Sequence, residues 1–128
     1  MDAFLEHVNY TVTNPEKTAG WMCELFDWHV RWSGDAIHGG RSLHVGNDTC
    51  YVVLFSGSAG KPLADAGVSY ERIGGFNHLG IVVDDLDAME ERVRKLGFKP
   101  HSHADYEPGR RFYFNDADNI EYEIVSYA

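Results

Sequence analysis

The chain has 128 residues, 44% hydrophobic and 24% charged, a balance typical of a globular domain and unlike that of disordered, collagenous or coiled-coil chains. Its formal charge of −9 has the wrong sign for nucleic-acid binding, and no apolar run approaches the roughly 18–20 residues of a membrane span. Two cysteines, Cys23 and Cys50, form no CxxC motif, which favours a reducing compartment. We therefore expect a cytoplasmic protein, a single domain over residues 1–128, with neither nucleic acid nor membrane as a partner.

An internal repeat organises the chain. The strand-like segment Leu5–Val12 resembles Phe76–Val83, so that His78 lies 71 residues after His7 at a matching position. A helix signal follows each segment: Asn14 and a first-turn proline in the first copy, and an Asp-Asp pair before an amphipathic run in the second. The two halves therefore begin with the same strand–helix unit.

Three shorter strand-like runs follow each helix. They are Trp28–Trp32, Ser42–Gly46 and Cys50–Phe55 in the first copy, and Phe98–His101, Arg111–Asn115 and Glu121–Val125 in the second. The polar segment Ala104–Arg110 between two of them is predicted to be a loop. The order β-α-β-β-β, found twice, predicts an α+β fold of two tandem βαβββ modules. We expect them to form a cupped, partly open eight-stranded mixed sheet with the helices outside: module one about 4–56, a linker over 57–74, and module two about 75–127.

Strand alternation predicts which side chains line the cup. In the first strand His7 and Asn9 point into it, and in the fifth strand His78 does so. In the last strand the same parity puts Glu121 and Glu123 in the cup. A single strand histidine is more often structural than a ligand, but two at matching positions with a carboxylate suit a divalent metal such as Fe, Mn, Ni or Zn. Such a site leaves coordination positions open for substrate oxygens.

The segment Phe112–Val125 resembles the aromatic-x-Phe-x-Asp-Pro-Asp-Gly-Asn-x-Ile-Glu-Leu ending of the vicinal oxygen chelate superfamily, with Ala117 and Asn119 in place of its Pro and Gly. That superfamily includes glyoxalase I, bleomycin- and fosfomycin-resistance proteins and extradiol dioxygenases. The resemblance implies His7, His78 and Glu123 as metal ligands, a small-molecule substrate and a homodimer. The linker permits a site within one chain or a site shared by two subunits.

One departure from the superfamily narrows the predicted chemistry. Matching the two final strands at an offset of 70 places Val53 where glyoxalase I has a fourth, acidic ligand. Because valine cannot bind a metal, we expect a three-ligand site of the dioxygenase or transferase type, acting as a lyase, a transferase or a ring-cleaving dioxygenase. No subfamily pattern matches completely. The alternative is a metal-free protein that binds and sequesters a small molecule or an antibiotic.

Five further residues are candidates for catalysis or for substrate binding. Tyr113 is a candidate donor to a developing oxyanion, or a packed strand aromatic. His44 is a substitute fourth ligand or a base if its face of the strand is the cup side, and a solvated surface residue otherwise. Asn9, Ser42 and Arg111 are candidate substrate contacts.

Overall fold

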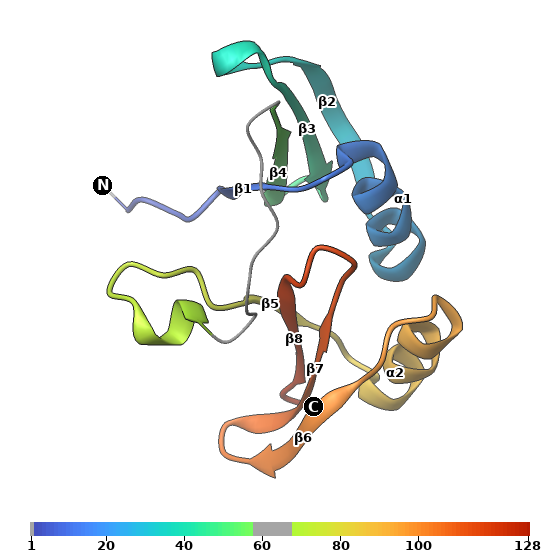
Figure 1. The fold of residues 1–128 in the computed structure, drawn as a ribbon. Helices are drawn as coiled ribbons and strands as arrows, with labels where there is room; N and C mark the ends of the chain where they lie inside the picture. The colour runs from blue at the N-terminus through green and yellow to red at the C-terminus, as the bar shows by residue number, and fades with distance from the viewer. Residues whose placement is uncertain (1, 58–67) are drawn as a thin grey trace. The chain divides into compact units, whose positions relative to one another are not determined.

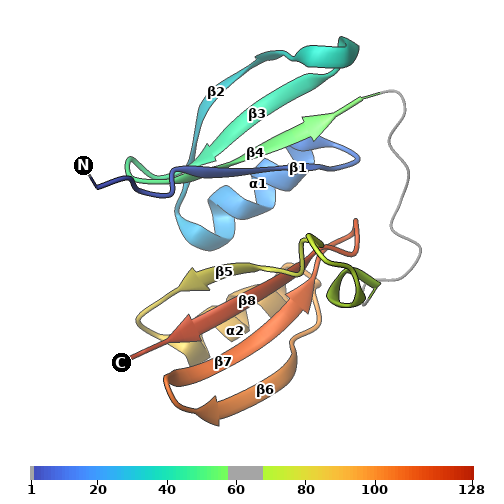
Figure 2. The ribbon, with the colours of Figure 1, turned by 90° about the vertical axis from the view of Figure 1, so that its left-hand side faces the viewer.

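The computed structural model describes residues 2–57 and 68–128, and the chain separates into two compact units, Met1–Lys61 and Pro62–Ala128 (Figure 1). Each unit contains one four-stranded mixed sheet with a helix on one face (Figure 2). The predicted α+β fold of two tandem βαβββ modules is thereby confirmed. Residues 58–67 of the expected linker lie outside the described residues.

The first unit runs through the elements β1 (His7–Thr11), α1 (Pro15–Phe26), β2 (His29–Asp35), a 3₁₀ turn (Ile37–Gly39), β3 (Arg41–Gly46) and β4 (Tyr51–Ser56). Its sheet has the order β1-β4-β3-β2, with β1 parallel to β4 and the other pairs antiparallel. The α1 helix packs against the sheet and buries Met22 and Leu25 with Val45 and Leu54. Side chains of opposite parity, including His44 and Val53, therefore lie on the helix-free face.

The second unit contains η2 (Val68–Glu71), β5 (Leu79–Val82), α2 (Leu86–Lys95), β6 (His101–Tyr106), β7 (Gly109–Asn115) and β8 (Glu121–Ser126). Its sheet order, β5-β8-β7-β6, repeats that of the first unit. Phe112, Phe114, Tyr122 and Ile124 are completely buried on the side of α2. No helix in either described stretch of the chain is long and apolar enough to cross a membrane.

Both helices begin where the sequence predicts. The Asn14 side chain accepts a hydrogen bond from the Lys17 amide, and Pro15 occupies the first helical turn. In the second unit Asp85 caps α2 by accepting from the Ala88 amide at 3.0 Å. These caps satisfy amide groups that have no partner within the helix itself.

The hairpin of β6 and β7 corrects two sequence predictions. The strand predicted over Phe98–His101 begins only at His101, and Ala104–Arg110 forms the two arms and turn of the hairpin instead of a loop. Phe98 packs its ring against Phe114 at 5.3 Å. The prediction failed because β6 is an edge strand, where polar residues can occupy both faces and hide the usual alternation.

Equivalent strands are paired in the same register within each of the two sheets, so positions in the two halves can be compared. In the first unit Val8 lies opposite Val52 and Asn9 opposite Val53. In the second unit Leu79 lies opposite Tyr122 and Gly80 opposite Glu123. Val53 therefore holds the position that Glu123 holds in its own sheet.

The turn before β8 is organised by one buried carboxylate. Asp116 accepts hydrogen bonds from the amides of Asp118 and Ile120 and from the Tyr122 hydroxyl, at 2.9–3.0 Å. Asn119 has a φ of 64°, the left-handed conformation in which asparagine can replace glycine. This turn sets the start of β8 and hence the placement of Glu123.

We predict that Asp116→Ala lowers the free energy of unfolding by about 2–4 kcal/mol, because three donors lose their acceptor in a buried turn. Urea denaturation followed by circular dichroism measures the change. Asp87→Ala is the control: this exposed carboxylate pairs with Arg110 at the surface, so its loss costs less than about 1 kcal/mol. Equal effects of the two substitutions would contradict the structural role given to Asp116.

Candidate metal centre

Glu123 is the centre of a polar cluster on the helix-free face of the second sheet. The Tyr113 hydroxyl donates to Glu123 Oε2 at 2.7 Å, and an Arg111 guanidinium nitrogen donates to the same oxygen at 3.1 Å. The Glu123 side chain is only 13% exposed. Tyr113 lies directly opposite Glu123 in the register of β7 and β8, so the backbone pairing itself fixes this contact.

The other carboxylate oxygen of Glu123 faces a histidine. His78 Nε2 lies 3.9 Å from Glu123 Oε1. The backbone beside that oxygen is Gly80, where even a Cβ would lie at 3.5 Å, an ordinary van der Waals contact. The sheet therefore occupies one oxygen of Glu123 with hydrogen bonds and presents the other, uncrowded, to an imidazole nitrogen.

Two tyrosines of this cluster keep their protons at neutral pH. Burial, followed by the hydrogen bond to Glu123, raises the pKa of Tyr113 to about 12. Burial and the hydrogen bond to Glu121 raise the pKa of Tyr70, in η2, to about 12. Tyr70 contacts Glu121 at 2.8 Å and His78 Nδ1 at 3.0 Å. Both phenols therefore act as hydrogen-bond donors to carboxylates in this site.

The helix-free face of the first sheet carries a second polar and aromatic cluster. His7 Nδ1 lies 3.0 Å from Glu6 Oε1, and the Tyr51 hydroxyl donates to that same oxygen at 2.8 Å. The Tyr51 ring stacks on both His7 and His44, with centroid distances of 5.1 and 5.0 Å. The Arg31 guanidinium lies 4.3 Å from the centre of the Tyr51 ring.

The candidate residues fall into two groups, one in each unit. Asn9, Ser42 and His44 share the helix-free face of the first sheet with His7, and Asn9 and His44 both lie opposite Val53. Arg111, Tyr113, Glu123 and His78 gather in the second unit. Within residues 2–57 and 68–128 no three His, Cys, Asp or Glu side chains gather closely enough to hold a metal. His78 and Glu123 are the part of the predicted triad that lies within one unit.

Glu6, Tyr51 and Tyr70 were missed by the sequence analysis. Tyr51 occupies the strand position equivalent to Glu121, so it could have been found from the repeat, and Glu6 directly precedes His7 in the sequence. Tyr70 lies in a segment interpreted as linker, where no periodicity indicates a contact.

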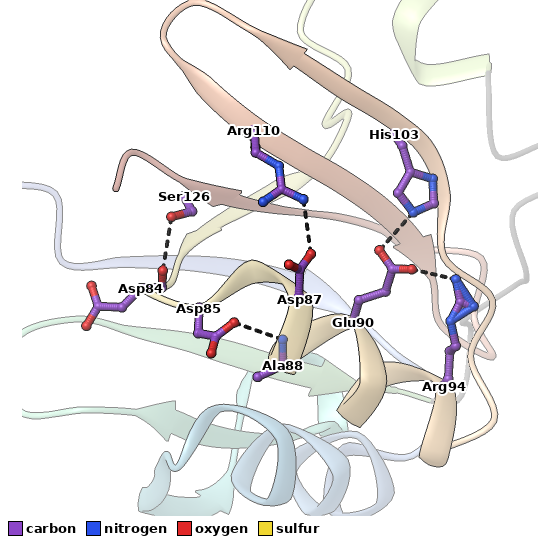
Figure 3. A network of polar contacts seen from close by, with 9 residues as sticks. All are labelled: Asp84, Asp85, Asp87, Ala88, Glu90, Arg94, His103, Arg110 and Ser126. Atoms are coloured by element: carbon purple, nitrogen blue, oxygen red, sulfur yellow. Dashed lines mark hydrogen bonds and ion pairs between the residues drawn. The ribbon is translucent and has the colours of Figure 1, made fainter.

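The opposite face of the second sheet carries a structural His–Glu pair for comparison. His103 contacts Glu90 of α2 at 2.8 Å, Arg94 pairs with the same carboxylate, and Arg110 pairs with Asp87 at 3.0 Å (Figure 3). The His103 side chain is 52% exposed. This pair joins α2 to the β6–β7 hairpin on the helix side, away from Glu123.

We predict that His44 is neutral at pH 7. Desolvation, followed by the nearby charges of His7 and Arg31, lowers the pKa of His44 below its ordinary value of 6.5. A titration followed by NMR of the imidazole protons, assigned with His44→Gln, should give a midpoint below 6.5. Arg31→Ala should raise that midpoint, because it removes a positive charge; a wild-type midpoint above 6.5 would contradict the prediction.

Comparison with known proteins identifies a family for the chain. Residues 4–124 match the model of the Glyoxalase/Bleomycin resistance protein/Dioxygenase superfamily. Among curated proteins, no sequence matches.

Solved structures share the fold over nearly the whole chain. A glyoxylase/bleomycin resistance protein/dioxygenase domain from Frankia sp. EAN1pec is 27% identical, with a TM-score of 0.81 over 98% of this chain and 93% of that one. The fosfomycin resistance protein FosX from Mesorhizobium loti is 26% identical, with a TM-score of 0.72 over 98% and 92%. FosX from Listeria monocytogenes, solved in complex with Mn(II) and sulfate ion, is 20% identical, with a TM-score of 0.74 over 98% and 93%, a likeness in fold. The chain belongs to the glyoxalase/bleomycin resistance protein/dioxygenase superfamily.

Proposed function

We propose that the chain is a metal-dependent enzyme that binds a small substrate through two neighbouring oxygens on a divalent cation held by His7, His78 and Glu123. The observation that carries the proposal is the pair His78 Nε2 and Glu123 Oε1, 3.9 Å apart on a sheet face. That separation is shorter than two metal–ligand bonds of about 2.1 Å each, so one cation can contact both atoms. Imidazole and carboxylate donors together suit Fe, Mn, Ni or Zn.

The second unit supplies residues that orient the carboxylate. Tyr113 and Arg111 both donate to Glu123 Oε2, which leaves Oε1 as the oxygen for the cation. Arg111 also brings a positive charge beside this carboxylate, where it favours a substrate oxyanion. A bound divalent cation would polarise substrate oxygens and stabilise negative charge that develops on them.

The first unit supplies the remaining parts of the proposed site. Val53 stands where a fourth ligand would be, so the protein contributes three ligands and leaves more positions for the substrate. His44, neutral at pH 7 and next to Val53, is the proposed base. We assign Asn9 and Ser42 to substrate contact. These features favour a lyase, a transferase or a ring-cleaving dioxygenase over the glyoxalase I reaction. The Mn(II) in FosX from Listeria monocytogenes supports a divalent metal for this fold.

We further propose a homodimer, in which His7 joins His78 and Glu123 either of its own chain or of a partner. Mixing His7→Ala chains with Glu123→Ala chains under conditions of subunit exchange separates the two arrangements. If each site is shared between subunits, the mixed dimer regains metal, because one of the dimer's two sites is then intact. A site within one chain stays defective in every combination.

We predict stoichiometric divalent metal in the wild-type protein and its loss in His7→Ala, His78→Ala and Glu123→Ala, because each substitution removes a ligand. Elemental analysis after loading with Fe, Mn, Ni or Zn and removal of excess ions measures the bound metal.

The matched controls are His103→Ala and Glu90→Gln, which disrupt a histidine–glutamate pair on the opposite face of the same sheet. Both controls should keep the metal. Wild-type protein that binds none of the four metals would overturn the proposal and favour a metal-free protein that sequesters a small molecule or an antibiotic.

A further inference from the structure

We infer that each imidazole of the proposed centre is fixed in the Nδ1–H tautomer by its own tyrosine–glutamate pair, Tyr51 with Glu6 for His7 and Tyr70 with Glu121 for His78. These four side chains are positioning residues: Glu6, Tyr51 and Tyr70 contact the histidines, and Glu121 acts through Tyr70. The inference rests on the proposed function, in which His7 and His78 bind the metal.

The second unit gives the argument for His78. The Tyr70 hydroxyl has one proton, and it donates that proton to Glu121 Oε2 at 2.8 Å. Its oxygen therefore meets His78 Nδ1, 3.0 Å away, as an acceptor, and the imidazole must supply the proton. With the proton on Nδ1, the lone pair of the neutral ring is on Nε2, the atom that faces Glu123 Oε1.

The first unit gives the same result for His7 by a shorter route. Glu6 Oε1 accepts from the Tyr51 hydroxyl at 2.8 Å and lies 3.0 Å from His7 Nδ1. A carboxylate only accepts, so His7 Nδ1 carries the proton and Nε2 carries the lone pair. Tyr51 also stacks on the His7 ring, which holds the plane of the imidazole as well as its tautomer.

The two tyrosine–glutamate pairs have the same role, but the tyrosine and the glutamate stand in exchanged positions in the two units. Tyr51 and Glu121 are the first residues of equivalent strands, β4 and β8. In the first unit the strand carries the tyrosine and Glu6 supplies the carboxylate. In the second unit the strand carries the carboxylate and η2 supplies the tyrosine. His7 therefore donates to a charged oxygen and His78 to a neutral one. Metal-binding histidines generally need such a partner on the nitrogen that does not bind the ion.

The experiment is a two-bond ¹H–¹⁵N NMR correlation on the metal-free full-length chain at about pH 8. His7 and His78 should both show the Nδ1–H pattern. Tyr70→Phe should abolish that pattern for His78 alone, and Glu6→Ala should abolish it for His7 alone. Glu6→Gln should retain it, because the amide oxygen still accepts a hydrogen bond from Nδ1–H. Tyr127→Phe, an exposed tyrosine of the same unit, should change neither histidine.

Metal affinity, measured by competition with a chelator, provides the second readout. Tyr70→Phe and Glu6→Ala should each weaken binding by about 10–100-fold, with unchanged circular dichroism. An Nε2–H pattern at either histidine of the wild type, or variants with unaltered tautomers, would overturn the inference even if the metal binds. Nδ1–H patterns in a wild type that binds no metal would overturn the proposed function alone, because the hydrogen-bonded pairs would then exist without an ion to serve.

Discussion

The site depends on one carboxylate whose two oxygens have different surroundings. Tyr113 and Arg111 hold Glu123 Oε2, and His78 Nε2 faces Oε1 across 3.9 Å. A carboxylate with two free oxygens could rotate, bind a cation through both, or pair with any nearby base. Here the neighbouring strand removes that freedom, because the backbone register sets Tyr113 opposite Glu123. The buried turn at Asp116 in turn fixes where β8 begins. The orientation of Glu123 Oε1 therefore depends on the Asp116 turn, on the strand register and on the two hydrogen-bond donors to Oε2.

Most of this arrangement could be predicted from the sequence, because strands have a strict period of two. Parity alone predicted that Glu123 and Glu121 share one face of the last strand, and in the structure Arg111 and Tyr113 of the neighbouring strand reach Glu123 on that face. The match between Val53 and Glu123 followed from the repeat and is confirmed by the register. The loop predicted over Ala104–Arg110 was wrong, because polar and apolar residues need not alternate along an edge strand. Tyr70 could not be predicted, because its contact with His78 depends on how a short 3₁₀ turn folds back onto the sheet.

Val53 and Glu123 occupy equivalent positions, and the difference between them gives the helix-free faces of the two sheets different polarity. In the first sheet, the position of the acid is apolar and 4% exposed, and the neighbouring His44 has a lowered pKa because of its desolvation. In the second sheet, an arginine and a phenol orient the acid by donating hydrogen bonds to it. A second acid at position 53 would add a negative charge beside His44 and favour its protonated form. Valine therefore leaves His44 with a free lone pair at neutral pH, which a base needs.

The exchanged tyrosine–glutamate pairs have a simple chemical reason. An imidazole that must present Nε2 needs only an acceptor at Nδ1, and both a carboxylate and a phenol oxygen can serve. A phenol serves dependably only when its own proton is committed elsewhere, which is why Tyr70 is joined to Glu121. A carboxylate serves without such help, and Tyr51 then restrains Glu6 instead of mediating between it and the ring. The geometry thus requires an acceptor oxygen for the Nδ1–H group, but not a particular residue at a particular strand position. Two modules can satisfy it with the same residue types in opposite places.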